Sequence, residues 1–234
     1  ASSNTNGSIT SQVSANPSAG FSIVSYTGNN TDDATVGHGL SRYPEIVIFK
    51  NRDATSNWLT MTSMLSNVGY INSTAALTTS RSYFSPSENS TWTTSIKLDA
   101  HVACNSADDF IAYAFHSVEG YSKVGSYTGD GLVSGATGTF VFCGFRPAFI
   151  LIKAAGLVRG WQLQDSKRSV FNGQGSRLEP NSSGAESTNS TTHVIDFLSN
   201  GFKLRHQDND INAQNQEYIF YAIAENPFKH TNAR

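Results

Sequence analysis

Short apolar runs separated by turn residues recur along the whole chain. The runs of the first half that are richest in β-branched and aromatic residues are 21–26, 46–50, 58–61 and 110–118. Such runs are typical of β-strands, and glycine-containing turns lie between them. No long stretch places apolar residues at the i, i+3, i+4 and i+7 positions of a helix. The pattern therefore predicts an all-β fold.

The last of these runs has a distinct alternation. Ile111, Tyr113 and Phe115 fall on one face of the expected strand, whereas Ala112 and Ala114 fall on the other. Because both faces are apolar, we expect a central strand of a β-sandwich whose outer face meets another layer.

The sequence also repeats itself at an offset slightly above 100 residues. Residues 20–28 return as 120–129, with Tyr-Thr-Gly in both copies. Later matches keep the same order, and they include Pro44 with Pro147, Trp58 with Trp161, Ile96-Lys97-Leu98 with Phe202-Lys203-Leu204, and Ile111 with Ile219. Ordered repetition predicts two homologous units, residues 20–119 and 120–234. We expect two tandem β-sandwich units of jelly-roll-like type.

The segment before the first unit, residues 1–19, consists almost wholly of small and polar residues. Such a segment buries little apolar area to offset the entropy lost on ordering. It predicts a polar N-terminal arm or linker, either mobile or laid along the surface of another chain.

Composition narrows the range of partners. Only 15% of the residues are charged, and the net charge is -2. Because no basic patch is present to attract phosphates, we expect no nucleic acid partner. No apolar stretch approaches the roughly 20 residues that span a bilayer, so we expect no membrane insertion. Solubility then comes from uncharged polar side chains.

The two cysteines, Cys104 and Cys143, form no recognisable pair motif. Cys143 follows an apolar run, where a free cysteine usually behaves as a small buried hydrophobic residue. We expect buried thiols, and a disulfide bond is the alternative.

Motifs of catalysis are absent: no nucleophile elbow, phosphate-binding loop, zinc-protease helix or EF-hand loop occurs. The six histidines are dispersed, without a metal-ligand spacing. We therefore expect no enzyme activity, no cofactor and no bound metal.

Three residues remain as candidate ligand contacts. Asp208 and Asp210, two residues apart before the last apolar run, offer the oxygen ligands that Ca²⁺ prefers, although such pairs are more often solvated turns. Trp92 lies in a polar segment and has no counterpart in the second copy. It is therefore the best of the tryptophans as an exposed contact, although a structural role is the favoured alternative. Trp58 and Trp161 are repeat equivalents, which favours packing for both.

Several segments together resemble a module of tailed-bacteriophage virion proteins. The segments that carry the resemblance are 6–11, 15–24, 34–40, 118–123, 125–129, 144–148, 195–205 and 224–229. The last two are similar to the C-terminal signature of tail-fibre-like proteins of phages that infect cyanobacteria and marine bacteria. The resemblance covers nearly the whole chain and offers no catalytic residues to carry over.

This resemblance implies a place on the virion exterior, assembly as a homotrimer and contact with other virion proteins. We expect a non-enzymatic tail fibre or appendage adhesin that contacts host surface glycan. The alternatives are a capsid decoration protein that stabilises the head and, with less support, a polysaccharide depolymerase.

Overall fold

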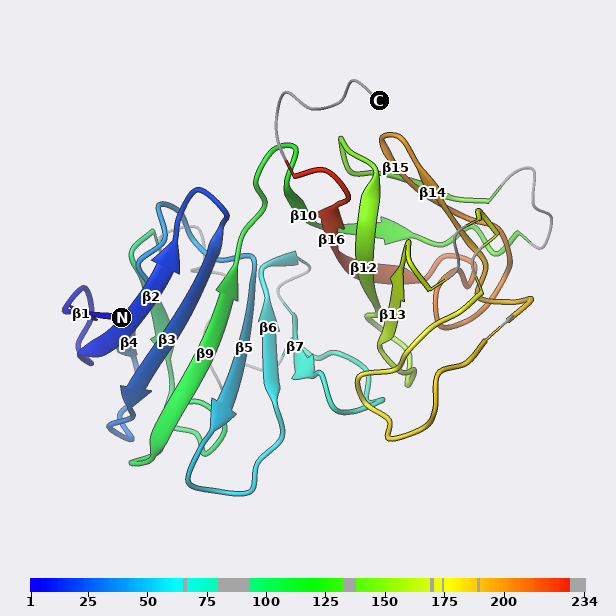
Figure 1. Ribbon diagram of the computed structural model, residues 1–234. Coiled ribbons are helices and arrows are strands. Elements are labelled where there is room, and N and C mark those ends of the chain that lie inside the picture. The colour runs from blue at the N-terminus through cyan, green and yellow to red at the C-terminus, as the bar shows by residue number, and fades with distance from the viewer. Residues whose placement is uncertain are drawn as a thin grey trace. The chain divides into compact units, whose positions relative to one another are not determined.

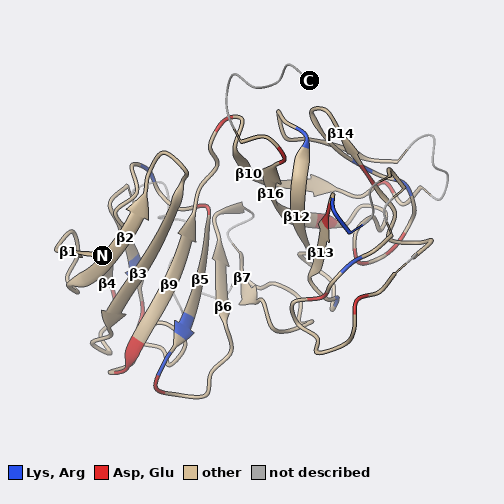
Figure 2. Cartoon of the chain, viewed as in Figure 1, with Lys and Arg blue, Asp and Glu red and all other residues tan. Residues whose placement is uncertain are grey.

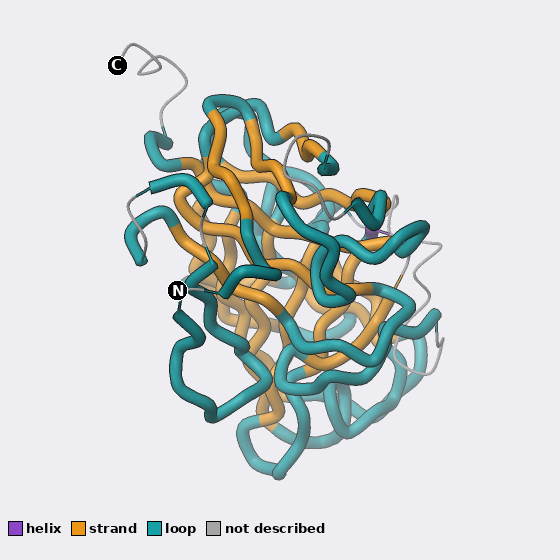
Figure 3. The backbone as a smooth tube through the Cα atoms, turned by 90° about the vertical axis from the view of Figure 1, so that its right-hand side faces the viewer, coloured by secondary structure: helices purple, strands orange, loops and turns teal. Residues whose placement is uncertain are grey.

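The computed structural model describes residues 1–64, 67–79, 93–132, 138–168, 171–173, 175–188 and 190–227. These residues form strands joined by loops (Figure 3) and contain no α-helix; the small helical segment drawn is a 3-10 conformation at Met64. The predicted all-β class is confirmed. Within this part of the chain, no helix has the length and apolar character needed to cross a membrane. Charged residues lie mostly in loops and at strand ends (Figure 2). Trp92 lies outside the described residues.

The chain divides into two compact units. Unit 1 comprises Ala1–Ile71 and Thr78–His116, and unit 2 comprises Asn72–Leu77 and Ser117–Arg234. The division after residue 116 lies three residues before the boundary expected from the repeat. The short segment 72–77 of the first sequence copy belongs to unit 2.

Unit 1 is a sandwich of two antiparallel sheets (Figure 1). Its strands are β1 (Ser2–Asn4), β2 (Ser11–Asn16), β3 (Phe21–Thr27), β4 (Ala34–Gly37), β5 (Ile46–Asn51), β6 (Leu59–Thr62), β7 (Asn67–Tyr70), β8 (Ser95–Leu98) and β9 (Asp109–Phe115). The larger sheet has the order β1-β2-β3-β9-β5-β6-β7, and β4 pairs with β8. Val24, Phe49 and Phe110 of the larger sheet pack with Val36 and Ile96 of the smaller one in one core.

The burial pattern of the central strand β9 shows which of its two faces points into the core. Ala112 and Ala114 are fully buried in the core, whereas Ile111, Tyr113 and Phe115 are half-buried on the outer face. The bulky face therefore points away from the core.

Unit 2 is built in the same way. Its strands are β10 (Ser122–Thr128), β11 (Phe140–Phe142), β12 (Pro147–Ala154), β13 (Gln162–Asp165), β14 (Ile195–Leu198), β15 (Gly201–Leu204) and β16 (Glu217–Ala224). One sheet has the order β10-β16-β12-β13 and the other the order β11-β15-β14. Ile150, Ile152 and Phe220 from the first sheet pack with Phe197 and Phe202 from the second.

The two units share topology and individual contacts. The order β10-β16-β12-β13 repeats β3-β9-β5-β6, and the pair β11–β15 repeats β4–β8. The hydroxyl of Tyr26 donates to the carbonyl of Cys104 at 2.6 Å, and that of Tyr127 donates to the carbonyl of Ile211 at 2.7 Å. These recurrences support the duplication inferred from the sequence.

The N-terminal segment differs from the predicted arm. Strand β2 pairs with β3 along its whole length, and β1 pairs with β2. Ile9 and Val13 are buried in the core of unit 1. Since β3 would otherwise be an edge strand, its free hydrogen-bonding groups order a segment that has little apolar surface of its own.

Cys104 and Cys143 form no disulfide bond and are both buried, which agrees with the buried thiol predicted for Cys143 in its apolar run. They lie in different units. Burial raises the pKa of each thiol to about 12, so both are protonated and weakly reactive at neutral pH.

Candidate functional site

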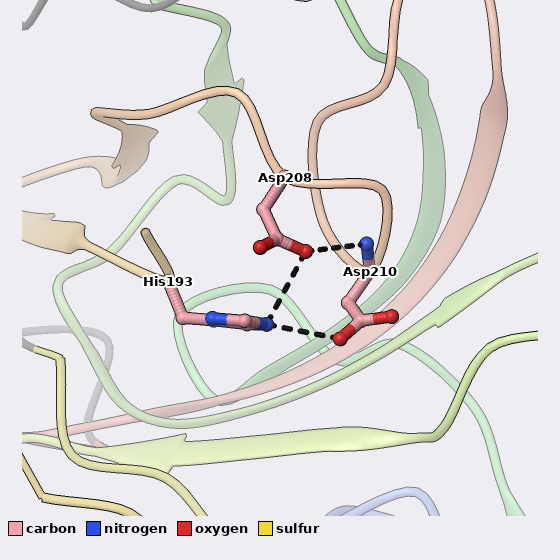
Figure 4. Close-up of side chains that lie close together, drawn as sticks. All are labelled: His193, Asp208 and Asp210. Carbon is pink, nitrogen blue, oxygen red and sulfur yellow. Dashed lines mark hydrogen bonds and ion pairs between the residues drawn. The ribbon is translucent and has the colours of Figure 1, made fainter. Parts of the chain in front are cut away.

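The predicted acid pair lies in the loop between β15 and β16, where a third residue joins it. His193, two residues before β14, places Nε2 2.9 Å from Oδ2 of Asp210 and 3.3 Å from Oδ1 of Asp208 (Figure 4). The histidine is buried, and both carboxylates are partly exposed. We call these three residues the His–Asp–Asp cluster.

The turn that carries the two aspartates is a feature of the fold. The N–H of Asp210 donates to Oδ1 of Asp208 at 2.8 Å, and the carbonyl of Asp208 accepts from Asn212. Unit 1 has the same turn, in which the N–H of Ala103 donates to Nδ1 of His101 at 3.0 Å. Unit 1 has alanine where Asp210 stands, so only unit 2 builds the cluster.

Hydrogen bonds on both ring nitrogens fix the orientation of His193. Nδ1 lies 3.0 Å from Oγ1 of Thr192 and 3.2 Å from Oγ of Ser190. A proton on Nε2 fits these contacts, because Nε2–H then donates to the carboxylates while Nδ1 forms its hydrogen bonds with the two hydroxyl groups.

Positive charges surround Asp210. Burial opposes its ionisation, but the hydrogen bond from His193 and the charges of His193, Arg159 and Arg177 together hold the pKa of its carboxyl below the ordinary value. Nε of Arg159 lies 3.8 Å from Oδ1 of Asp210. Asp210 is therefore an anion at neutral pH.

A buried lysine also acts on this carboxylate. Lys153 is fully buried, and its ammonium group donates to the carbonyls of Ala154 and Leu157 at 2.9 and 3.2 Å. Burial lowers the pKa of Lys153 to about 8, and the charge of Asp210 acts in the opposite direction.

Strand β13 adds polar side chains to the interior beside the cluster. Gln162 and Gln164 are each 1% exposed, and the amide of Gln164 donates to the carbonyl of His193 at 2.8 Å. Both amide atoms of Gln162, Oε1 of Gln164 and Nε of Arg177 have no hydrogen-bond partner in the described chain. Buried polar atoms nearly always have a protein, water or ligand partner.

The corresponding positions of unit 1 are apolar. Leu59 pairs with Phe49, as Gln162 pairs with Ile152, and Met61 pairs with Val47, as Gln164 pairs with Ile150. Unit 1 thus has an aliphatic core at the place where unit 2 has a polar one.

The ligand atoms of His193, Asp208 and Asp210 all lie within 4.8 Å of one another, so the cluster has the donors for a metal ion. Its charge does not favour one. Arg159, Arg177 and Lys153 already act on Asp210, and a divalent cation would be repelled by all three. The geometry is that of a charge-balanced hydrogen-bond network that presents carboxylate oxygens toward solvent.

Sequence reasoning found the aspartates and missed the histidine. His193 stands 15 residues before Asp208, a spacing that belongs to no metal or catalytic motif. A signal was present in the repeat, since Leu59 and Met61 of the first copy align with Gln162 and Gln164 of the second. Of the two equivalent tryptophans, Trp161 is buried as predicted, whereas Trp58 is 37% exposed and stacks on Tyr113.

Comparison with known proteins gives one match. A family model described as a domain of unknown function, DUF7483, matches residues 1–227. No curated protein matches the chain, and no solved structure matches it.

Proposed function

The chain belongs to the DUF7483 family, and from this premise we propose that it is a non-enzymatic structural protein of the phage virion exterior, a tail fibre or appendage adhesin that contacts host surface glycan. The sequence resemblance supports the virion setting. The His–Asp–Asp cluster of unit 2 supports the contact with glycan.

The observation that carries the glycan contact is the polar site that unit 2 has and unit 1 lacks. Sugar hydroxyls both donate and accept hydrogen bonds, and they pair well with planar carboxylate, amide and guanidinium groups. Asp208, Asp210 and Arg159 supply such groups at partial exposure. Because His193 and the turn fix the carboxylates before binding, little side-chain entropy is lost on contact.

The same geometry gives no support to glycoside hydrolysis. A hydrolase needs one carboxyl group with a raised pKa as the general acid and a second, ionised one about 5–10 Å away. The pKa of Asp210 is lowered, and Asp208 and Asp210 both contact the same nitrogen of His193. The cluster therefore supports binding rather than proton transfer to a leaving group.

The remaining parts of the proposal concern assembly. Rigid sandwich units present loops at fixed positions, and a homotrimer repeated on one virion raises the avidity of a weak site. The capsid decoration alternative depends on a free arm at residues 1–19, and the pairing of β2 with β3 gives that arm less support.

Two measurements test the proposal. The purified chain is titrated against a panel of bacterial capsule and lipopolysaccharide glycans, beside the double variant Asp208→Asn with Asp210→Asn. We expect a loss of at least about tenfold in affinity, equivalent to about 1.4 kcal/mol. The matched control is Asp33→Asn in unit 1, which breaks an exposed contact with Lys97 and leaves affinity unchanged.

Immunogold labelling of intact virions gives the second measurement. A few copies at the tail agree with an adhesin. Labelling over the whole head would overturn the adhesin role in favour of capsid decoration, and equal affinity of the double variant would remove the cluster from the binding site.

A further inference from the structure

Strand β13 carries several polar side chains on the face that points into unit 2. Gln162 and Gln164 pair with two core residues of β12, so both amide groups face the interior. The N–H of Ser166 donates to the carbonyl of Ala148 of β12 at 2.8 Å, which continues the pairing and places Ser166 on the same face. The two glutamines are each 1% exposed, and Ser166 is 9% exposed.

A guanidinium group lies beside these side chains. Leu163 of β13 pairs antiparallel with Leu178, which places Arg177 opposite Gln164 on the same face. Nη2 of Arg177 donates to Oε1 of Glu179 at 3.3 Å, whereas Nε of Arg177 is buried and has no partner in the described chain. Arg177 thus adds a buried donor to the amides and the hydroxyl of β13.

We call Gln162, Gln164, Ser166 and Arg177 the polar row, and five of its buried atoms need a partner. They are Nε2 and Oε1 of Gln162, Oε1 of Gln164, Oγ of Ser166 and Nε of Arg177. No other buried side-chain nitrogen or oxygen lacks a partner in the described part of unit 2. Two of the five atoms donate hydrogen bonds, two accept them, and the hydroxyl does both.

This balance of donors and acceptors identifies the partner as water. A cation would be repelled by the guanidinium group of Arg177, and an anion would be repelled by the amide oxygens, which only accept. Because the glutamines are 1% exposed, the partner must also be small enough to be enclosed in the folded unit. Water meets both conditions. A buried water makes about three hydrogen bonds, so about two waters satisfy the five atoms.

The polar row is joined to the His–Asp–Asp cluster. Nε2 of Gln164 donates to the carbonyl of His193 at 2.8 Å, and Nε2 of His193 contacts Asp208 and Asp210. A partner on Oε1 of Gln164 would fix the amide that holds this carbonyl. The row then supports the backbone from which the imidazole ring reaches the two carboxylates.

We propose that the polar row binds ordered water inside unit 2, and that Gln164, held by this water, positions His193 and through it the carboxylates of the cluster. The binding of water goes beyond the proposed function and needs no glycan. The positioning role deepens the proposed function and rests on it, so separate measurements test the two parts.

The first test counts long-lived internal waters of the full chain by magnetic relaxation dispersion. The double variant Gln162→Leu with Gln164→Met installs the residues that unit 1 has at these positions, and it should hold at least one water fewer than the wild type. The matched control is Gln12→Leu, which changes an exposed glutamine of unit 1 and should keep the wild-type number. Equal numbers in the wild type and the double variant would overturn the binding of water.

A second measurement needs only the wild type, and it covers a double variant that does not fold. In NMR spectra, cross-peaks between water and the side-chain amide protons of Gln162 should have the sign that marks long-lived water. The amide of Gln12 should show only the sign of freely exchanging water. The same sign at both glutamines would contradict the proposed site.

The single variant Gln164→Met tests the positioning role. It should shift the NMR resonance of Nε2 of His193 and lower glycan affinity at least about threefold, whereas Gln12→Leu should change neither. Loss of affinity in the aspartate double variant without loss in Gln164→Met would leave the proposed function standing and refute the positioning role. If neither variant loses affinity, the proposed function and the positioning role both fail, and the water count still decides whether the polar row binds water.

Discussion

At the scale of single residues, the molecule is most informative where the two units differ at one position. Gln162 and Gln164 occupy core positions that Leu59 and Met61 fill in unit 1. Leaving a buried polar atom without a partner costs about 1–3 kcal/mol. Three amide atoms of these two glutamines are buried without a partner in the described chain, so unit 2 gives up stability at a place where unit 1 has aliphatic side chains, which is typical of a binding site.

Lys153 predicts a pH dependence of stability. Its folded pKa of about 8 lies below the ordinary 10.5, so the unfolded chain binds more protons between those values. Stability from this residue therefore rises with pH through that window. Cys104 and Cys143, whose pKa values are raised, act in the opposite sense above about pH 9.

The difference between wild type and Lys153→Met isolates the lysine. Urea unfolding from pH 7.5 to 9.5 should show the wild type gaining stability relative to the variant as pH increases. A constant difference across this range would mean that Lys153 keeps an ordinary pKa in the folded state.

At the scale of elements, the two copies of the central strand pair solve one packing problem in two ways. Val24 of β3 faces Ala112 of β9, whereas Gly125 of β10 faces Phe220 of β16. A Cβ at Gly125 would lie 2.7 Å from the ring of Phe220. In unit 1 the larger side chain of the facing pair belongs to β3, whereas in unit 2 it belongs to β16.

A double-mutant cycle tests this exchange. Gly125→Val forces the ring of Phe220 to move and should lower the free energy of unfolding by about 1–3 kcal/mol. Phe220→Ala alone leaves a cavity that costs about 3–5 kcal/mol. The double variant recreates the pair of unit 1, so its loss should be smaller than the sum of the single losses by at least about 1 kcal/mol. Additive losses in urea unfolding would contradict the exchange.

Local pattern predicted the strands that carry their own apolar residues, and it failed where a strand depends on a partner. Residues 21–26 and 46–50 closely match β3 and β5, and the predicted run 110–118 contains most of β9, which ends at Phe115. Strand β2 has Val13 as its one large apolar residue and is ordered by pairing with β3. His193 was missed for a similar reason. It lies in the loop before β14, and only the folded structure brings it to Asp208 and Asp210 in the loop between β15 and β16.

At the scale of the whole molecule, each unit has its own core. A core substitution is therefore expected to destabilise only the unit that contains it. Val13 is 5% exposed in the core of unit 1, and its neighbour Gln12 points outward on the same strand. Val13→Asp buries a charge, whereas Gln12→Asp does not.

Hydrogen exchange followed by mass spectrometry checks this separation. Val13→Asp should speed exchange in β3 and β9 by at least about tenfold while β12 and β16 stay protected. Gln12→Asp should leave both units unchanged. Equal loss of protection in both units would mean that they unfold as one body.

The assignment of residues 72–77 to unit 2 bears on the order in which parts of the chain fold during synthesis. Domains generally fold in turn as the chain is synthesised, so the rest of unit 1 can be complete once residue 116 has left the ribosome. The N–H of Leu77 donates to the carbonyl of Ala155 at 2.8 Å, and this hydrogen bond can form only after Ala155 has been synthesised. A plasmid encoding only 117–234 would lack this segment, so a split-gene experiment needs residues 72–77 on the second fragment.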